Sequence, residues 1–361
     1  MDPSALRRFG RAALPIVALL VFAVVVGGTI RAAAQADTLG YDFLAYHQAA
    51  VRLLDGQPLY DMSFATTGGF GLFYYPPTFA PLILPFGLLP ETTAVWTWTA
   101  ILIGSFAVGT AVLPVSRTIR WWVVLLAGLS WPFAYAVKLG QVGPILFLLF
   151  AIGWRWLDDP IRLGASAALG TAIKLQPAII VVWAALTGRW AAVVVGTAVL
   201  AVLAVLATLI AGVGAWADFV TLVRQVGDPI TTPHNFTPGA IAYQLGVSSE
   251  VASLVQLGST VVVLAAVLAS IRWATAEASY LVTVIASQLL SPVLWDHYAM
   301  ILLLPVAYLC AAGRWWALAI PLVTATPLVG LTPPVAYPLV FFVTLGVTLG
   351  IGVQARRAAE A

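Results

Sequence analysis

The chain is dominated by apolar runs that recur along almost its whole length. They occupy residues 12–30, 93–113, 121–137, 142–157, 163–187, 190–212, 250–271, 276–290, 296–311, 315–331 and 334–353. A run of about 20 apolar residues is long enough to cross a bilayer as a helix. Only 9% of the residues are charged and 61% are hydrophobic, which is far more apolar than a soluble domain. The sequence therefore predicts an all-α polytopic membrane protein.

The placement of basic residues predicts how these helices are oriented. The run 163–187 is broken by KLQP and the run 76–89 is short, so we expect two half-length helices and an interfacial or re-entrant piece. Of the 17 basic residues, 12 then fall on one side, which the positive-inside rule places in the cytoplasm. We expect one domain, residues 1–361, with about 12 transmembrane helices and both termini cytoplasmic. The basic residues on that side are Arg7, Arg8, Arg11, Arg117, Arg120, Arg155, Arg162, Arg189, Arg272, Arg314, Arg356 and Arg357.

The first apolar run has features of a secretory signal and of a membrane anchor. Three arginines precede it within residues 1–11, and an Ala-x-Ala pattern follows it at 34–36. The run is nearer a full span than the roughly 7–15 apolar residues of a signal, and Arg31 interrupts the segment before the Ala-x-Ala pattern. We expect an uncleaved anchor.

The polar stretches all fall on the outer face in this topology. They are a first loop at about 31–77, KLGQVG at 138–143, KLQP at 174–177, a second long loop at about 213–249 and SPVLWDHY at 291–298. The predicted cytoplasmic connections are short turns with an arginine and an interfacial tryptophan. Any chemistry is therefore expected at the outer face.

Several classes of function lack their sequence signals. The chain has no GxxxxGK[ST], HExxH or GxSxG pattern, no GxGxxG after a strand and no DxD pattern. With one cysteine and three histidines we expect neither a metal site nor a cofactor. No basic run or basic-aromatic stripe is present, so nucleic acid is not an expected partner.

Isolated polar residues at membrane depth are the candidates for chemistry, because ions are costly there. Asp42 begins a predicted interfacial helix at 42–54, and spacing alone favours an N-cap over a catalytic role. Lys138 with Gln141, and Lys174, lie at predicted helix breaks, where a lysine can hold a phosphate or snorkel to the interface. Two such breaks on one face favour an anion site.

SPVLWDHY places two further polar side chains at a helix start. Pro292 ends one helix, and Asp296 with His297 begins the next. Asp296 is favourable at a helix N-terminus whatever its role, whereas His297 can donate to a phosphate or to a sugar hydroxyl. We expect His234, in the second long loop, to be a structural residue.

The ordered set of stretches resembles the polyprenol-phosphate-dependent glycosyltransferases of family 87. The resemblance rests on GYDFLAYHQAAVRLLDGQPLY with YYPPTFAPLILP, followed by GQVGPILFLL, KLQP and SPVLWDHY, and it extends from Asp42 to Tyr298. These are GT-C-type membrane enzymes and include actinobacterial mannosyltransferases. The family pattern often has two adjacent histidines after WD, whereas this chain has His297-Tyr298, which weakens any role that requires a histidine pair.

The resemblance implies a GT-C-type bundle with short interfacial helices in the first outer loop, and an inverting sugar transfer. It implies a polyprenyl monophosphate sugar as donor, reached from the bilayer, and a lipid-linked or polysaccharide acceptor. It assigns the general base to Asp42, against the capping role that spacing favours. Lys174, Lys138 and His297 would then stabilise the leaving group, and Gln141, Tyr46, Tyr75, Trp295 and Asp296 would contact sugar or phosphate.

Alternatives remain open for the transferred sugar and for the class of function. Mannose is the first expectation, and arabinofuranose from a decaprenyl phosphate donor is the second. A lipid or sugar transporter also uses broken helices, but no repeated halves are visible and the polar residues gather at one face. An inactive partner of another transferase is the third alternative.

Overall fold

The structure is a computed structural model that describes residues 3–63, 72–225 and 228–361. Every regular element in these ranges is a helix, and they contain no β-strand, so the predicted all-α class is confirmed for them. The elements of the first half are α1 (Pro3–Gln35), α2 (Tyr41–Leu54), η2 (Pro77–Phe79), α3 (Ala80–Ile83), η3 (Leu84–Leu88), α4 (Glu91–Val112), α5 (Arg117–Leu129), α6 (Trp131–Leu139), α7 (Gly143–Arg155), α8 (Pro160–Ile173) and α9 (Ala178–Leu186). Those of the second half are α10 (Trp190–Ala211), α11 (Gly214–Gln225), η4 (Pro229–Thr231), α12 (Pro238–Gln244), α13 (Ser249–Trp273), α14 (Ala276–Leu289), η5 (Asp296–Leu302), α15 (Leu303–Ala311), η6 (Trp315–Leu318), α16 (Ala319–Leu322), η7 (Thr326–Leu328) and α17 (Ala336–Glu360).

Five of the described helices are long and apolar enough to cross a membrane. They are α4, α10, α13, α17 and the segment Ala12–Gln35 of α1. A sixth crossing is formed if α6 and α7, which meet at an angle of 117°, act as one broken span. The chain is therefore a multi-pass membrane protein. Its orientation and its description as one domain stay predictions, and the parts of the predicted outer loops at 64–71 and 226–227 lie outside the described residues.

The predicted count of about 12 transmembrane helices is not confirmed, because several apolar runs form helices shorter than a span. The run 121–137 is divided at Ser130 into α5 and α6, and α8, α14 and α15 have 14, 14 and 9 residues. The predicted break at KLQP is present between α8 and α9, and 76–89 forms only the short elements η2, α3 and η3. The interfacial placement of α2 stays a prediction.

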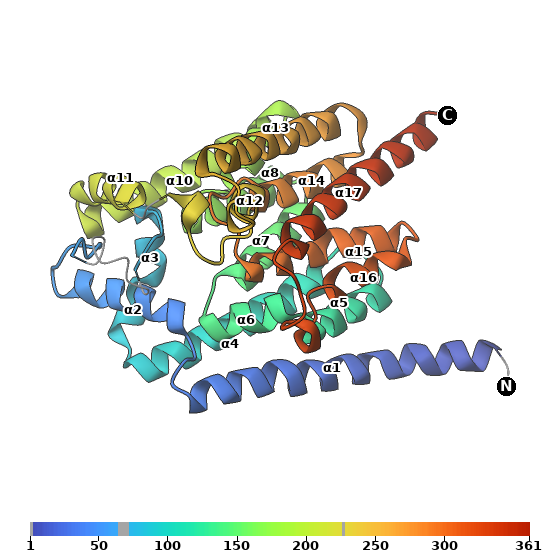
Figure 1. Cartoon of the computed structure of the whole chain (residues 1–361), viewed down its shortest axis with the longest axis horizontal. Coiled ribbons are helices and arrows are strands. Elements are labelled where there is room, and N and C mark those ends of the chain that lie inside the picture. Colours follow the sequence, from blue (N-terminus) through green and yellow to red (C-terminus); the bar gives the residue numbers. More distant parts are fainter. Residues whose placement is uncertain (1–2, 64–71, 226–227) are drawn as a thin grey trace.

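The helices are arranged so that both chain ends lie toward the same end of the molecule, at opposite edges. Figure 1 shows α1 along one edge of the molecule, in contact with α5 and α6, and α10 with α13 along the opposite edge. Both chain ends lie at one end of the long axis, whereas α2, α3 and α11 lie at the other. α1, α10 and α13 expose most of their apolar side chains, as expected of helices that face lipid.

Small residues allow α8 and α10 to pack closely. α8 packs against α10, and a Cβ on Gly164 would lie 2.3 Å from the Ala192 carbonyl oxygen and 3.0 Å from the Gly196 nitrogen. Glycine at such a crossing lets two backbones approach, which is the usual way membrane helices gain packing contacts. α8 runs from this contact to the KLQP break, which follows its last residue.

The start of α2 differs from the expectation that Asp42 caps this helix. The N-cap of α2 is Gly40, with φ 76°, and no side chain caps the helix. Asp42 lies in the first turn, so the capping role that spacing favoured is wrong. The Gly40 N–H donates instead to the Lys138 carbonyl oxygen at 2.8 Å, which ties α2 to the end of α6.

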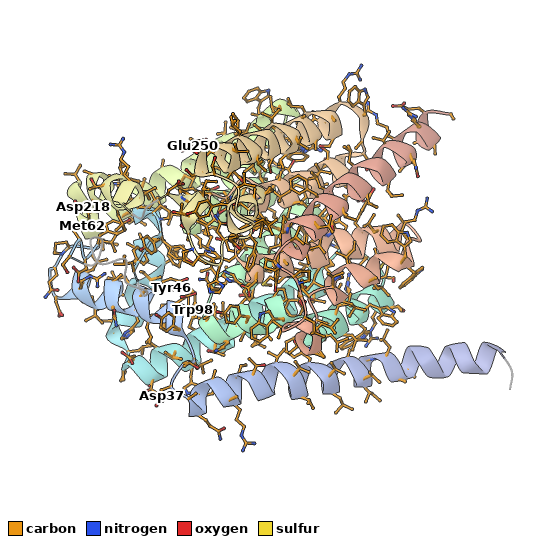
Figure 2. The ribbon with its side chains drawn as sticks, viewed as in Figure 1. Asp37, Tyr46, Met62, Trp98, Asp218 and Glu250 are labelled. Atoms are coloured by element: carbon orange, nitrogen blue, oxygen red, sulfur yellow. The ribbon has the colours of Figure 1, made fainter. Side chains whose placement is uncertain are left out.

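A second glycine turn, at the end of α6, completes this contact. Gly140 has φ 75° and lies against α2, where an added Cβ would be 2.6 Å from the Phe43 Cβ. Its carbonyl oxygen accepts a hydrogen bond from the Trp98 indole nitrogen at 2.7 Å. In Figure 2, Trp98 and Tyr46 point into the interior beside α2, while Asp37 and Glu250 lie at the periphery. Only glycine fits at position 140, because both the backbone angle and the lack of space exclude a side chain.

We predict that Gly140→Ala destabilises the protein more than Gly188→Ala does. Both glycines have φ 75°, so alanine costs about 1–2 kcal/mol of backbone strain at either position. No atom lies within 4 Å of a Cβ at Gly188, whereas Gly140→Ala overlaps Phe43 and adds about 1–3 kcal/mol of overpacking. Thermal unfolding in detergent measures the difference, and equal apparent midpoints for the two variants would contradict the packing described.

Candidate active site

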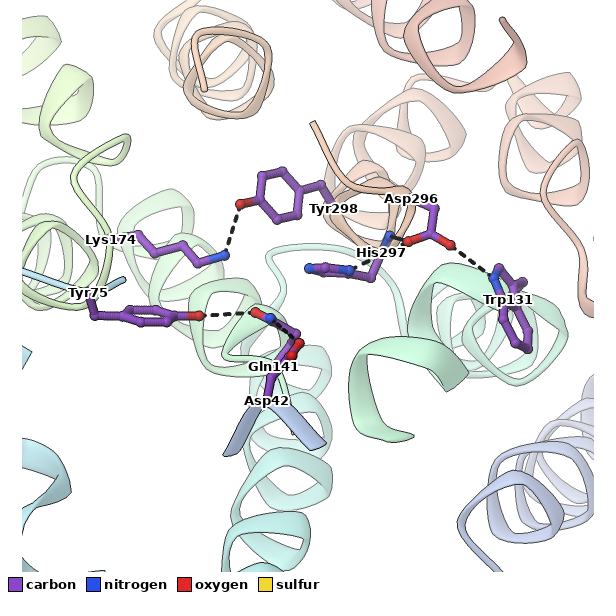
Figure 3. A network of polar contacts seen from close by, with 8 residues as sticks. All are labelled: Asp42, Tyr75, Trp131, Gln141, Lys174, Asp296, His297 and Tyr298. Atoms are coloured by element: carbon purple, nitrogen blue, oxygen red, sulfur yellow. Dashed lines mark hydrogen bonds and ion pairs between the residues drawn. The ribbon is translucent and has the colours of Figure 1, made fainter. Parts of the chain in front are cut away.

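Asp42 is held by an amide from a distant part of the chain. Its side chain is half-buried, and the Oδ2 oxygen accepts a hydrogen bond from Gln141 Nε2 (Figure 3). Gln141 follows the Gly140 turn directly, so the contact between the two glycine turns brings these side chains together. The first turn of a helix also stabilises a negative charge, because the N-terminal end carries a partial positive charge. The carboxylate is thus fixed in one orientation.

The orientation of the Gln141 amide is set by two tyrosines. Tyr75 donates its hydroxyl hydrogen to Gln141 Oε1 at 3.1 Å, and the hydroxyl oxygens of Tyr46 and Tyr75 are 2.5 Å apart. Burial raises the pKa of Tyr75 to about 12, so this hydroxyl keeps its hydrogen at neutral pH. Because that hydrogen goes to Gln141, Tyr46 is the donor to Tyr75. All the hydrogen bonds of this chain therefore point toward Asp42.

Lys174 occupies the break between α8 and α9 and is surrounded by neutral groups. Its Nζ donates to the Tyr298 hydroxyl at 3.0 Å and lies 4.4 Å from the centre of the Tyr298 ring and 5.7 Å from that of Tyr75. Cation–π contacts of this kind hold an ammonium group without neutralising it. Lys174 forms no salt bridge with a carboxylate in the described part of the chain. Its positive charge is therefore left for a ligand.

Two side-chain hydrogen bonds fix the break that carries Lys174. Gln176 Nε2 donates to Ser291 Oγ at 2.8 Å, which joins the KLQP segment to SPVLWDHY. Thr78 Oγ1 donates to the Ala172 carbonyl oxygen at 2.9 Å, which joins the end of α8 to the YPPT segment. Three motifs that are far apart in the sequence thus meet at one place.

Asp296 and His297 lie at the start of η5, opposite α6. Asp296 Oδ2 accepts a hydrogen bond from Trp131 Nε1 at 3.1 Å, and Oδ1 accepts one from the His297 backbone N–H at 2.8 Å. The His297 ring contacts the rings of Tyr135 and Tyr298 edge to face, with centroids 6.3 and 5.0 Å apart. In Figure 3 its imidazole lies on the side of Asp296 that faces Lys174 and Gln141.

The second long loop is fastened to the segment that precedes Asp296. The Asn235 side chain is fully buried, and its Oδ1 accepts from the backbone N–H groups of Thr237 and Leu294 at 3.0 and 2.9 Å. Its Nδ2 donates to the carbonyl oxygens of Pro229 and Pro292 at 2.8 and 3.2 Å. One amide therefore satisfies four backbone groups and fixes the loop before η5, a role that loop composition alone did not reveal.

The remaining predicted residues are less central. The Lys138 ammonium lies 5.8 Å from the centre of the Tyr135 ring, and its carbonyl oxygen takes part in the α2–α6 contact. Trp295 is partly buried against the hydrophobic core. Sequence reasoning missed Trp131, which reads as an interfacial tryptophan, and it gave Tyr298 no role although it lies in SPVLWDHY. No group of three potential metal-binding side chains lies together in the ranges that the structure describes.

Comparison with known proteins identifies the family. Residues 73–295 match glycosyltransferase family 87, and this range is more than half of the 361 residues. The chain belongs to glycosyltransferase family 87. The resemblance expected from the ordered motifs is thereby confirmed. The family match includes Tyr75, Gln141 and Lys174, whereas Asp42 lies before it and His297 after it.

Two curated relatives of this family 87 chain are mycobacterial mannosyltransferases. The polyprenol-phosphate-mannose-dependent alpha-(1-2)-phosphatidylinositol pentamannoside mannosyltransferase of Mycolicibacterium smegmatis is 30% identical over 269 residues, 68% of this chain and 63% of that protein. The corresponding phosphatidylinositol mannoside mannosyltransferase of Mycobacterium tuberculosis is 25% identical over 303 residues, 76% of this chain and 70% of that protein. The chain thus spans 63% of the first relative. No solved structure matches the chain.

We predict that Tyr75→Phe destabilises the protein while Tyr74→Phe does not. Removal of the Tyr75 hydroxyl leaves the buried Tyr46 hydroxyl and Gln141 Oε1 without their partner, at a cost of about 1–3 kcal/mol. Tyr74 is exposed, so its substitution should change stability by less than about 0.5 kcal/mol. Thermal unfolding in detergent compares the two variants. Equal midpoints would show that the Tyr75 hydroxyl is dispensable.

Proposed function

We propose that this protein is a membrane glycosyltransferase that moves mannose from a polyprenyl monophosphate donor to a lipid-linked or glycan acceptor. Membership of family 87 supports the reaction class, and the names of the two relatives support mannose and a polyprenol phosphate. The single observation that carries the proposal is the pairing of an oriented carboxylate, Asp42, with an unneutralised cation, Lys174, around one polar cluster.

Asp42 is the general base in this proposal. Its carboxylate takes the proton of the acceptor hydroxyl as the acceptor oxygen attacks the anomeric carbon from the face opposite the phosphate. A new carbon–oxygen bond forms, the bond between the anomeric carbon and the phosphate oxygen breaks, and its electron pair leaves with the polyprenyl phosphate. This displacement inverts the anomeric centre. Positioned proton transfer of this kind typically contributes about 10²–10⁴-fold in rate.

Lys174 stabilises the charge of the departing phosphate. A preorganised cation acts most strongly where charge develops and water is scarce, and no further group is needed as cofactor. Lys138 and His297 are the further candidates for contacts with phosphate or sugar. Gln141, Tyr46 and Tyr75 orient Asp42, and Asp296 and Trp295 border the segment that carries His297.

We place this site at the outer face of the cytoplasmic membrane, with both termini in the cytoplasm. The two chain ends lie at one end of the long axis, and α2 and α11, which belong to the polar loops, lie at the other end. Most basic residues also fall on the side of the termini, which supports the same orientation.

We predict that Asp42→Asn lowers sugar transfer by about 10²–10⁴-fold, because the amide cannot accept the proton. Membranes that contain the protein are incubated with radiolabelled polyprenyl-phosphate mannose and a lipid-glycan extract. Asp55→Asn is the matched control, since Asp55 is exposed at the other end of α2.

The outcomes of these experiments have distinct meanings. Transfer by wild type that is lost in Asp42→Asn and kept in Asp55→Asn supports the base. Transfer that survives in Asp42→Asn at equal expression refutes that role. If wild type transfers no mannose, the sugar is wrong, and decaprenyl-phosphate arabinose is the next donor. In a separate assay with liposomes, movement of the mannose or arabinose lipid across the membrane without sugar transfer would make the protein a transporter.

We predict that Lys174→Gln lowers transfer by about 10²–10³-fold, which is typical for loss of one group that stabilises developing charge. Arg224→Gln, on the exposed surface of α11, removes a positive charge elsewhere in the predicted outer region and should leave transfer unchanged. The same radiolabel assay measures both variants. An equal loss in the two would mean that overall charge, rather than the position of Lys174, matters.

A further inference from the structure

His297 is a buried histidine at the edge of the candidate site. Its side chain is 5% exposed, and neither Nδ1 nor Nε2 is hydrogen-bonded to any of the described residues. A buried polar group without a partner is costly, so such groups usually await a ligand or water. The ring lies beside the cluster of Asp42, Gln141 and Lys174 (Figure 3). It is therefore an unsatisfied polar group at the candidate site.

The position of the ring is set by Asp296, which is itself held from α6. Trp131 Nε1 donates to Asp296 Oδ2 at 3.1 Å, and α6 packs against η5. Asp296 Oδ1 lies 3.5 Å from His297 Nδ1, too far for a good hydrogen bond but close enough for a strong electrostatic effect. In Figure 3 the other side of the ring is directed toward Lys174 and Gln141.

The Asp296 carboxylate favours a hydrogen on one of the two ring nitrogens. The Asp296 carboxylate attracts the imidazole hydrogen to Nδ1, because that nitrogen faces it. Nε2 is then left with a lone pair that faces the cluster.

His47 provides a contrast within the same chain. It is also buried, and its Nε2 lies 3.0 Å from the Leu89 carbonyl oxygen. A carbonyl oxygen only accepts, so His47 carries its hydrogen on Nε2. The two buried histidines are therefore expected in opposite tautomers.

We propose that Trp131 and Asp296 are positioning residues that keep the His297 hydrogen on Nδ1, so that Nε2 accepts a hydrogen bond from a hydroxyl of the transferred sugar. A lone pair on Nε2 would repel phosphate oxygens, which have no hydrogen to donate. The phosphate is therefore bound by Lys174 in this proposal. This assignment rests on the proposed function for the presence of a sugar. It makes His297 a residue that recognises the sugar and not the leaving group.

The tautomer is tested by nitrogen NMR of the protein labelled with ¹⁵N-histidine in detergent. The chain has three histidines, so His234→Gln and His297→Gln assign the spectrum. We expect the ring hydrogen on Nδ1 in His297 and on Nε2 in His47. Trp131→Phe and Asp296→Asn should each give His297 a mixture of tautomers, whereas Trp190→Phe, on the exposed face of α10, should change nothing. Neutral Nε2–H or a cationic ring at His297, or variants that leave its tautomer unchanged, would overturn the proposal.

Lipid binding tests which part of the donor His297 contacts. Dissociation constants are measured for a short-chain polyprenyl-phosphate mannose and for the same polyprenyl monophosphate without sugar. We expect His297→Gln to weaken binding of the mannose lipid about 5–10-fold, the equivalent of one hydrogen bond, and to leave the sugar-free lipid unchanged. Lys174→Gln should weaken both lipids. Equal weakening of the two lipids by His297→Gln would place His297 at the phosphate instead.

Both measurements are independent of turnover. If wild type binds the lipids but transfers no sugar, the proposed function fails while the role of His297 is still decided by the two dissociation constants. If wild type transfers mannose but the spectrum shows the other tautomer, the proposed function stands and this inference falls.

Discussion

The contact between two left-handed glycine turns underlies the rest of the polar site. Gly40 opens α2 and donates to the end of α6, while Gly140 closes α6 and lies against Phe43 of α2. Backbone groups meet where side chains would normally keep them apart, so the first loop is fixed to a helix break that lies about 100 residues further along the chain. Asp42 and Gln141 meet as a consequence, in a chain whose apolar helices would otherwise provide no reason for them to do so.

The apolar surroundings explain how the polar groups of the site are paired. In apolar surroundings a polar group without a partner is costly, and the hydroxyl and amide groups of Tyr46, Tyr75 and Gln141 satisfy one another in sequence. Lys174 is treated differently, because aromatic rings and a hydroxyl hold it while no described carboxylate neutralises it. The site thus separates a rigid, hydrogen-bonded carboxylate from a cation that remains available to an anion.

Local features of the sequence predicted the local structure. KLQP marks a helix break, α2 begins one residue before the expected helix at 42–54, and the ordered motifs identified the family. Apolar length alone did not give the helix lengths, because runs such as 121–137 are divided near Ser130 and Pro132 into short helices. The partners of Asp42 and Asp296 lie 99 and 165 residues away, so no spacing rule could reveal that Gln141 and Trp131 pair with them. Asn235 escaped notice for the same reason.

The one-way chain of hydrogen bonds that ends at Asp42 makes the two oxygens of its carboxylate unequal. Oδ2 faces the N–H of Gln141, whose amide cannot turn over without breaking its bond from Tyr75. In the proposed role of Asp42 as a base, Oδ1 is the favoured oxygen for the proton, because Oδ2 already accepts the Gln141 N–H. In the proposed reaction, this inequality restricts the direction from which an acceptor hydroxyl approaches Asp42, and so it favours one hydroxyl on an acceptor that has several.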